Sequence, residues 1–356
     1  MTNKLNDNLN LDSLIVRPIE DKEKDRWNHL IKKHHYLHSH RLVGESMRYI
    51  ATINHRWVAL LGWTGPSFKL ADRDDWIGWC KKHKQQRVKY IANSARLLIL
   101  PEINIKNLAS KALACNLKRL SDDWIQKYNH PIIMAETFID PSRFKGTCYR
   151  AANFIEIGKT KGYGVSAGDY YYHGNKKLIL VYPMQRKTRY LLTAPFLSPI
   201  LALGSDKKPL VNLNRLNIFE DDGLIDRLSN VSNWRSKYGK RHQKGIILSM
   251  AVCAILSGHG GGYREIGRWV EALPWEVAKK FGCSYIHTFR KPSEPTLRRS
   301  LQGVNGSEVA QIVADWLKKG GQKRAIPKTC RKIHHFCRVK MDVETFIPAI
   351  MGGELS

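Results

Sequence analysis

The sequence predicts an α+β chain in which a mixed-sheet α/β domain, residues 14–190, precedes a smaller all-α domain, residues 215–326. Two observations predict this order. Apolar runs of strand length alternate with helical periodicity in the first half, whereas the second half carries only helix-like segments. Two closely spaced prolines and the stretch GSDKKPLVNLN predict a linker at 191–214. A polar tail at 1–13 and a basic, aberrant tail at 327–356 complete the expected organisation.

The elements of the first domain are predicted from local patterns. The clearest helix follows Asn107, a residue that can cap it, because its apolar residues form one stripe. That stripe comprises Leu113, Leu117, Leu120, Trp124 and Tyr128. In chain order we expect a strand at 14–19, a helix from Asp21, a hairpin at 47–65, a helix and then a loop at 76–93, a strand at 94–101, the helix from Asn107, a strand at 131–140, a short helix from Gly146 and a strand at 177–184. In the second domain we expect helices at 246–258, 264–273, 274–282 and 308–320.

The charge balance predicts a polyanionic partner. Lysine and arginine number 59 against 31 aspartate and glutamate residues, which gives a formal net charge of +28. Such a field attracts polyanions, and nucleic acid is the commonest of these for a basic protein. The alternative is a solvated basic surface that binds no polyanion. We predict that DNA is the partner.

The cysteine count and the absence of apolar spans indicate the compartment. Seven cysteines, an odd number at wide spacings, indicate reduced thiols. The opening stretch MTNKLNDNLNLDSL is polar, and no uncharged apolar run approaches the ~18 residues of a membrane span. We therefore expect a cytoplasmic protein with no membrane partner.

Two carboxylates are the first catalytic candidates. Glu136 and Asp140 occur at the end of the strand predicted at 131–140. A separation of four on an extended chain turns both side chains to one face. Paired carboxylates can hold Mg²⁺ or divide acid and base roles between them. Alternatively, each anchors a loop through backbone N–H groups or pairs with Arg143.

Histidines and cysteines suggest two further sites. His35, in KKHHYLHSHR, is a third catalytic candidate. Neighbouring side chains on a helix point about 100° apart, so His34 and His35 do not readily face one ion, which favours a structural or nucleic-acid-contacting role. A C-x3-H-H-x-C arrangement in the tail could bind zinc, but its spacing is unusual and a DNA-adhering tail is the preferred interpretation. Its members are Cys330, His334, His335 and Cys337. We expect no metal site.

Two segments are candidate nucleic-acid contacts. In the first, five cations fall within nineteen residues and aromatic residues are interleaved with them; cations can contact phosphates and aromatics can stack on bases. The alternative is a buried aromatic core under a wet basic face. The second segment, RKPSEPTLRR, resembles a helix start with Ser293 as its cap, which a helix-turn-helix would present to DNA. The candidate binding residues are Arg143, Lys145, Tyr149, Arg150, Lys159, Lys161, Arg298 and Arg299.

The second half carries motifs of a known family. KRHQKGIILSMAVCAILSGHGGGYREIGRWVEAL and RKPSEPTLRRSLQGVN, within 217–326, resemble the N-terminal helical domain of H-repeat-type insertion-sequence transposases. In that family the domain precedes a DDE core, whose three acidic residues hold two metal ions. A segment like AVDGKTLRG would follow, whereas this chain reads RAIPKTCRKIHHFC. We therefore expect no DDE activity here, and no residue matches a DDE position.

The first half resembles the domain that defines DruA, a component of the Druantia anti-phage systems, over about 14–190. The matching motifs are HHYL (34–37), ARLLILP (95–101), NLASKAL (107–113) and ETFIDPSRFKGTCYRAANFIEIGKTKGYG (136–164). Domains of this kind also occur fused to transposases of the type just described, so the combination is a familiar one.

The same half is also similar to GNAT acetyltransferases in its strand order and in YRAANFIEIGKTKG. That resemblance implies a GNAT-like fold. Acetyltransferases cradle the pyrophosphate of acetyl-CoA with a glycine-containing loop and the N–H groups of the following helix. The corresponding stretch here, LPEINIKNLASKAL, has no glycine, which makes a close backbone approach to phosphate difficult.

Together these observations predict a DNA-binding protein of a Druantia-type defence or mobile-element system, without its own DDE core. It would act with partner proteins such as a defence helicase or an active transposase. We expect no bound cofactor, although a nuclease would use Mg²⁺. The alternatives are a metal-dependent nuclease, an acyltransferase that uses the GNAT-like domain, and a decayed transposase fusion.

Overall fold

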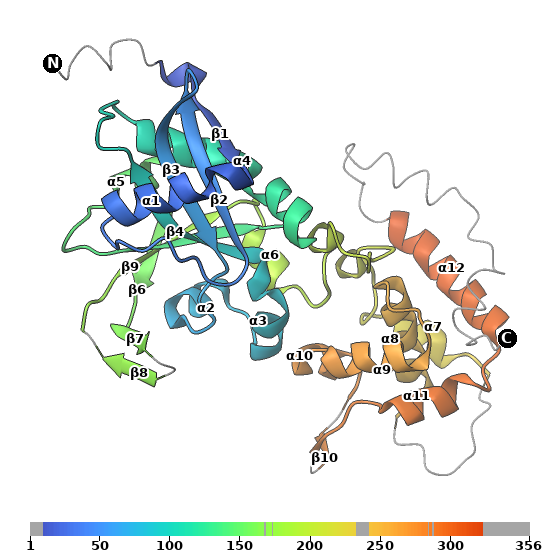
Figure 1. Cartoon of the computed structure of the whole chain (residues 1–356). Helices are drawn as coiled ribbons and strands as arrows, with labels where there is room; N and C mark the ends of the chain where they lie inside the picture. The colour runs from blue at the N-terminus through green and yellow to red at the C-terminus, as the bar shows by residue number, and fades with distance from the viewer. Residues whose placement is uncertain are drawn as a thin grey trace. The chain divides into compact units, whose positions relative to one another are not determined.

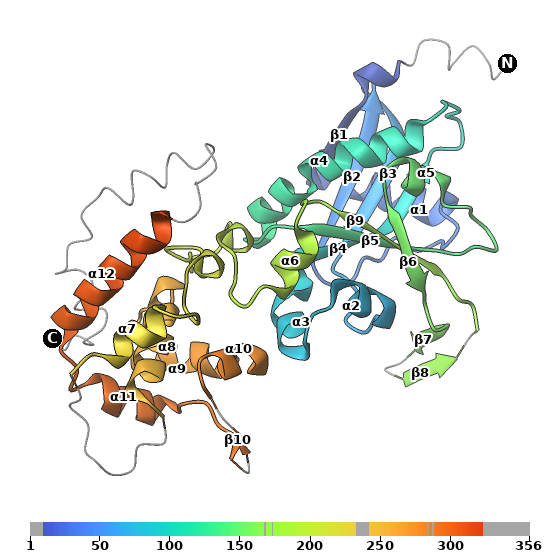
Figure 2. The same ribbon diagram turned by 180° about the vertical axis from the view of Figure 1, so that it is seen from behind.

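The computed structural model divides the chain into two compact units (Figures 1 and 2). One comprises Met1–Thr193 with Leu203–Ser205, and the other Ala194–Ala202 with Asp206–Ser356. The division falls inside the predicted linker, where Phe196 and Leu213 are nevertheless buried in the core of the second unit. The structure describes residues 10–166, 169–172, 174–232, 242–283, 285–286 and 288–322.

The first unit is built on a seven-stranded mixed sheet in the order β1-β2-β3-β4-β5-β9-β6. All neighbouring strands are antiparallel except β4 and β5, which are parallel. The strands are β1 (Ile15–Pro18), β2 (Ser46–Ile53), β3 (Arg56–Thr64), β4 (Ile91–Ile99), β5 (Met134–Ile139), β6 (Ile155–Lys159) and β9 (Leu178–Pro183). The helices of this unit are α1 (Lys24–His34), α2 (Ala71–Ile77), α3 (Lys81–Arg87), α4 (Leu108–Tyr128), α5 (Thr147–Ala151) and α6 (Thr188–Thr193).

The β2–β3 hairpin lies where the sequence predicts it. Asn54 and His55 form its two-residue turn, with φ angles of 48° and 64°. Positive φ at both turn positions matches the twist of the flanking strands, and asparagine tolerates it well. Both strands are almost wholly buried, and the indole of Trp63 donates to Asn116 of α4 at 2.6 Å. The hairpin is therefore part of the core.

Helix α4 presents the predicted apolar stripe to that core: Leu113, Leu117, Leu120 and Trp124 are buried. The predicted cap is wrong in detail. Asn107 precedes the helix with φ of 64°, and its side chain makes no capping hydrogen bond. The left-handed backbone, which asparagine tolerates, is what this position needs.

Two boundaries before α4 also differ from the prediction. The segment expected as one helix and a loop, 76–93, forms the end of α2, then α3 and a 3₁₀ turn at Val88–Tyr90. Gly78, with φ of 79°, ends α2 and permits the second helix to begin in a new direction. Strand β4 then begins at Ile91 rather than at residue 94.

Strands β4 and β5 separate after a short paired region. They pair only at Ile91–Met134, Ala92–Ala135 and Asn93–Glu136, although both strands continue. The register of β3 against β4 shifts at the same point, so that one residue of β4, Ala95, lies outside the ladder. A bulge of this kind bends a strand and raises its twist, which directs the rest of β4 away from β5.

The 155–176 region contains three strands that the sequence prediction missed. They are β6, β7 (Tyr163–Ser166) and β8 (Asp169–Tyr172), of which the last two form a separate two-stranded ladder. Glycines and short polar runs interrupt this region, so its alternating runs are shorter than those by which strands are recognised.

The second unit is helical around α8. Every residue of α8 from Gly245 to Leu256 is buried, so this helix has no polar face. The helices are α7 (Leu224–Ser229), α8 (Lys244–Leu256), α9 (Tyr263–Ala272), α10 (Trp275–Lys280), α11 (Glu294–Leu301) and α12 (Gly306–Gln322), with a small ladder of β10 (Tyr285–Ile286) and β11 (Thr288–Phe289). No helix in the described part of the chain combines the length and apolar character needed to cross a membrane.

Candidate nucleic-acid interface

Two loops that are distant in sequence meet at Tyr36. The ring of Tyr36, just after α1, contacts Phe144 edge-on with centroids 5.0 Å apart. The guanidinium carbon of Arg143 lies 5.8 Å from the centroid of the Tyr36 ring. The loop that follows α1 and the loop that follows β5 therefore form one surface.

Arg96 of β4 holds the first of these loops in place. Its Nε donates to the carbonyl of Ser39 at 2.7 Å, and its Nη2 donates to that of Arg41 at 3.2 Å. Arg96 is half-buried, and burial lowers its pKa, but an arginine remains charged at pH 7. One cation thus orders the backbone of the HSHR segment.

This surface, which we call the Tyr36 surface, combines exposed cations with exposed apolar groups. The two segments that form it, 32–41 and 141–155, contain no acidic residue. Phe144 is 46% exposed and Leu37 is 42% exposed. Its exposed cations include Lys32, Lys33, Arg41, Arg143, Lys145 and Arg150. The arrangement can accept phosphates on the cations while apolar groups contact sugars or bases.

The predicted catalytic role of Glu136 is corrected by its burial. Its side chain is wholly inaccessible, and both carboxylate oxygens accept from Nη1 of Arg73, at 3.2 and 3.4 Å. Burial raises the pKa of Glu136, and the charge of Arg73 opposes that effect. A carboxylate that is enclosed in an ion pair does not reach a substrate, so Glu136 is a structural residue.

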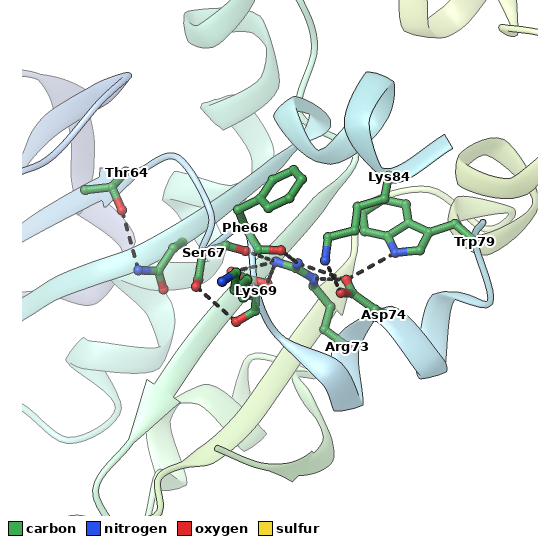
Figure 3. A network of polar contacts seen from close by, with 10 residues as sticks. Thr64, Ser67, Phe68, Lys69, Arg73, Asp74, Trp79 and Lys84 are labelled. Atoms are coloured by element: carbon green, nitrogen blue, oxygen red, sulfur yellow. Dashed lines mark hydrogen bonds and ion pairs between the residues drawn. The ribbon is translucent and has the colours of Figure 1, made fainter. Parts of the chain in front are cut away.

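Arg73 connects this carboxylate to a wider network (Figure 3). Its guanidinium also donates to Asp74 at 2.9 Å and to the carbonyl of Ser67 at 2.7 Å. Asp74 in turn accepts from Lys84 at 2.5 Å and from the indole of Trp79 at 3.1 Å. The network ties α2, α3 and the loop after β3 to strand β5, which explains why a fully buried arginine is present here.

Asp140 lies beyond the end of β5 and does not join Glu136. Its Oδ1 accepts from the backbone N–H of Ser142 at 3.0 Å and from its hydroxyl at 2.6 Å. These bonds lower the pKa of Asp140, and Arg143 approaches it at 3.6 Å. Residues 10–322, apart from the gaps stated above, contain no group of three or more acidic, histidine or cysteine side chains suited to a metal ion. Asp140 therefore shapes the loop that carries Arg143 and Phe144, as in the alternative interpretation.

His35 is also a supporting residue. It is 4% exposed, and its Nδ1 accepts from the backbone N–H of Leu37 at 3.2 Å. Burial, with the charge of Arg96 as a second cause, lowers the pKa of His35 to about 4. A neutral, enclosed imidazole fixes the turn that follows α1. The catalytic interpretation of His35 is therefore corrected.

Tyr149 does not belong to the binding surface. It is buried, its hydroxyl lies 2.9 Å from that of Ser94, and its ring contacts Phe154 edge-on. Tyr149 packs at the point where β4 and β5 separate. The aromatic and cationic residues of this segment thus divide between core and surface, which their alternation in sequence does not reveal.

The remaining candidates stay exposed. Arg150 pairs with Glu156 at 2.6 Å and also donates to the carbonyl of Lys145. Lys159 and Lys161 lie at the end of β6 and just beyond it.

In the second unit, α11 carries Arg298 and Arg299. Arg298 lies 3.7 Å from Glu294, and Arg299 donates to the carbonyl of Pro295 at 3.2 Å. The predicted cap of α11, Ser293, contacts the hydroxyl of Thr296 instead of a backbone N–H. The cysteines and histidines of the tail lie outside the described residues.

Acetyl-CoA, which the GNAT resemblance implies, does not fit the residues present. The loop between β4 and α4 contains no glycine, and its Leu100 and Ile103 are buried in the core. The backbone N–H of Leu108, at the start of α4, donates to the carbonyl of Ile105. The glycine-containing loop that would hold the pyrophosphate is therefore absent from the described connection between β4 and α4.

Comparison with known families assigns both units. Residues 7–167 match the family model described as Druantia protein DruA, and residues 225–317 match the model described as DDE transposase-associated. The chain joins a DruA domain to a transposase-associated domain. No curated protein matches the sequence. The DruA domain carries the Tyr36 surface, and the transposase-associated domain carries Arg298 and Arg299.

Solved structures similar to this half of the chain include acetyltransferases. The ribosomal-protein-S18-alanine N-acetyltransferase from Escherichia coli is 12% identical, with a TM-score of 0.30, covering 48% of this chain and 94% of its own. Spermidine N-acetyltransferase from Vibrio cholerae is 12% identical, with a TM-score of 0.31, covering 51% and 99%. Aminoglycoside acetyltransferase AAC(6′)-Ib is 13% identical, with a TM-score of 0.32, covering 49% and 96%. The predicted fold class, a mixed-sheet α/β domain followed by a helical domain, is confirmed by the strand order and the element order.

The sequence prediction overlooked Tyr36 and Arg96, which assemble the Tyr36 surface. A signal for Tyr36 was present, because it is the one aromatic residue in the basic run KKHHYLHSHR. Arg96 carried no such signal. An arginine inside an apolar strand shows its role only when the loop that it holds is known.

Proposed function

We propose that this chain binds DNA through the Tyr36 surface, as a protein of an anti-phage defence or mobile-element system. The observation that carries the proposal is the contact of Tyr36 with Phe144 and Arg143. It joins two acid-free segments, more than 100 residues apart, into a single basic and aromatic surface. Arg96, His35 and Asp140 support that surface from beneath, so its shape is built into the fold.

Charge alone does not select this surface, since the chain is basic throughout. The proposal rests on clustering: the exposed Phe144 contacts Tyr36, next to the exposed Leu37, and apolar side chains mark contact sites when they cluster. A phosphate backbone would meet Arg143 and Lys145 first, and the apolar groups would then lie against sugars or bases. The matches to the DruA and transposase-associated family models support the setting of a defence or mobile-element system.

A binding titration against salt tests the proposal. Each phosphate contact releases condensed counterions, so the logarithm of the binding constant falls with the logarithm of salt by about 0.9 per contact on duplex DNA. The double variant Arg143→Ala/Lys145→Ala should bind a 25-base-pair duplex more weakly and reduce this slope by roughly 2.

The matched control is Lys111→Ala/Lys118→Ala, which removes the same charge from exposed positions on α4. It should leave the slope within about 0.5 of the parent value. If both double variants reduced the slope equally, the binding would reflect the overall charge of the chain, and the proposal that DNA binds at the Tyr36 surface would be refuted. The proposed protein partners, a defence helicase or an active transposase, are tested by co-purification with the products of adjacent genes.

A further inference from the structure

The strands β7 and β8 form an arm that leaves the seven-stranded sheet. They pair only with each other, in the register Tyr163–Tyr172, Gly164–Tyr171, Val165–Tyr170 and Ser166–Asp169. Both views show this ladder beyond the end of β6, apart from the sheet (Figures 1 and 2). The arm is thus an appendage of the DruA domain and adds nothing to its core.

The arm is joined to the sheet through a narrow neck. Thr160 donates its backbone N–H to the carbonyl of Lys177 at 2.8 Å, and the N–H of Lys177 donates to the Thr160 hydroxyl at 2.9 Å. One step further out, Gly174 donates to the carbonyl of Gly162 at 3.2 Å. Both glycines have positive φ, 78° and 74°, and a Cβ on Gly162 would lie 3.1 Å from the carbonyl carbon of Gly174. The neck therefore requires glycine and holds the two chains close together.

Beyond the neck, the arm presents two aromatic rings on one face. Tyr163 and Tyr172 are direct cross-strand partners, and their ring centroids lie 5.1 Å apart at an angle of 55°. The two side chains are 59% and 63% exposed. An isolated two-stranded ladder has no core of its own, so this aromatic face stays open to a partner.

Cations surround the neck below these rings. Lys159 and Lys161 precede β7, and Lys176 and Lys177 follow β8. Asp169 is the only acidic residue between 159 and 177. Aromatic rings beside a basic track are the combination by which proteins hold single-stranded nucleic acid: lysines follow the phosphates and bases stack on the rings. A duplex offers no free base face to such rings, since its bases already stack on one another.

We propose that the β7–β8 arm binds unpaired bases of single-stranded DNA on Tyr163 and Tyr172, with Lys159 and Lys161 on the adjoining phosphates. This inference rests on the proposed DNA-binding function and adds the kind of DNA that one part of the chain selects. The Tyr36 surface supplies affinity for DNA of any form, and the arm adds affinity for strands that are open.

Fluorescence anisotropy with the full chain tests the arm. The probes are a labelled 20-residue oligothymidine and a 20-base-pair duplex, measured with the parent chain, Tyr163→Ala/Tyr172→Ala and Tyr163→Phe/Tyr172→Phe. The alanine pair should weaken single-strand binding by roughly fivefold to a hundredfold, the range for one lost base–aromatic stack, and leave duplex binding within about twofold. The phenylalanine pair keeps the ring faces and should bind both probes like the parent.

The outcomes separate the two proposals. Parent-like oligothymidine binding by the alanine pair would overturn the arm proposal, as would an equal loss on both probes. A phenylalanine pair as weak as the alanine pair would overturn stacking as its basis. If the parent chain bound the duplex but not oligothymidine, the arm proposal would be refuted and the proposed DNA-binding function would stand. Failure of the parent to bind either probe would remove the proposed function, and the inference with it.

Discussion

Loss of Arg73 should destabilise the DruA domain through the carboxylate that it leaves behind. Arg73→Met keeps most of the side-chain volume but leaves the wholly buried Glu136 without its cation. Removing one partner of a buried pair costs about 3–5 kcal/mol, because the remaining charge is uncompensated in a medium of low polarity. Arg73 itself keeps Asp74 and the Ser67 carbonyl when Glu136 is changed. Glu136→Gln should therefore cost less, about 1–3 kcal/mol.

The double variant Arg73→Met/Glu136→Leu provides the matched comparison. It replaces both charges by apolar groups of similar size, and such replacements are often neutral or stabilising. Here Asp74 loses one of its partners but keeps Lys84 and Trp79. We expect the double variant to regain at least half of the free energy of unfolding that Arg73→Met loses.

The cost of Arg73→Met should also depend on pH in a defined direction. Without Arg73, burial and the charge of Asp74 raise the pKa of Glu136 above the unfolded value of about 4.3, and only the backbone hydrogen bond from Ser67 opposes them. A carboxyl group whose pKa is raised by folding stabilises the folded state below its unfolded pKa, and that stabilisation is lost as the pH rises through its folded pKa. The variant should therefore approach the parent in stability near pH 4 and fall behind it toward pH 8.

Urea titrations of the three variants, with hydrogen exchange of β4 and β5 peptides to assign the transition to the DruA domain, supply these values. Two units can unfold separately, so the exchange data identify which transition shifts. A cost below about 1 kcal/mol for Arg73→Met would refute the reasoning, as would a double variant no more stable than the single one.

Three further predictions concern single residues. The parent should lose up to about 3 kcal/mol of stability as the pH falls from 6.5 toward 4, because the folded state, with a His35 pKa of about 4, takes up the proton less readily than the unfolded state. His35→Asn retains a hydrogen-bond acceptor but does not titrate, so this loss should be absent in the variant. Equal acid sensitivity of variant and parent in urea titrations would contradict the prediction. Gly162→Val should speed hydrogen exchange at the Gly174 amide and leave β5 protected, since it strains a positive φ and crowds the neck; slow exchange at Gly174 would contradict it. The hydroxyl of Ser249 is buried with no hydrogen-bond partner in the described part of the chain. Ser249→Ala should therefore raise the stability of the helical unit by about 1 kcal/mol, measured by calorimetry. A decrease in stability would contradict this prediction.

The elements that sequence predicts well are those whose information is local. The stripe of α4 and the hairpin predicted at 47–65 depend on neighbours within a few residues, and both are confirmed. The predicted ends of elements were less accurate. Strand β5 ends at Ile139, one residue before Asp140, so the rule that residues four apart on a strand share a face does not apply to Glu136 and Asp140. The strand order and the separation of β4 from β5 depend on pairing between distant segments, and no local pattern encodes them.

The location of the candidate site remains a proposal, whereas burial contradicts the roles predicted for several of its residues. Tyr149 and Tyr163 occur in one segment and look alike in sequence, yet the first is buried and the second is 59% exposed. The partner of Glu136 lies 63 residues away in α2, so sequence alone showed a free carboxylate where the fold has an ion pair. Roles of this kind are decided by tertiary packing, whereas the basic and aromatic character of the segment is decided by composition.

The apolar helix α8 has a consequence for how the second unit reaches its folded state during synthesis. It contacts α7, which precedes it, but also α9 and α11, which leave the ribosome later. Until those helices are made, a helix without a polar face is exposed to water and to other chains, which favours aggregation. Chains that end between α8 and α11 should therefore depend on chaperones for solubility, and the helical unit should fold only as a whole.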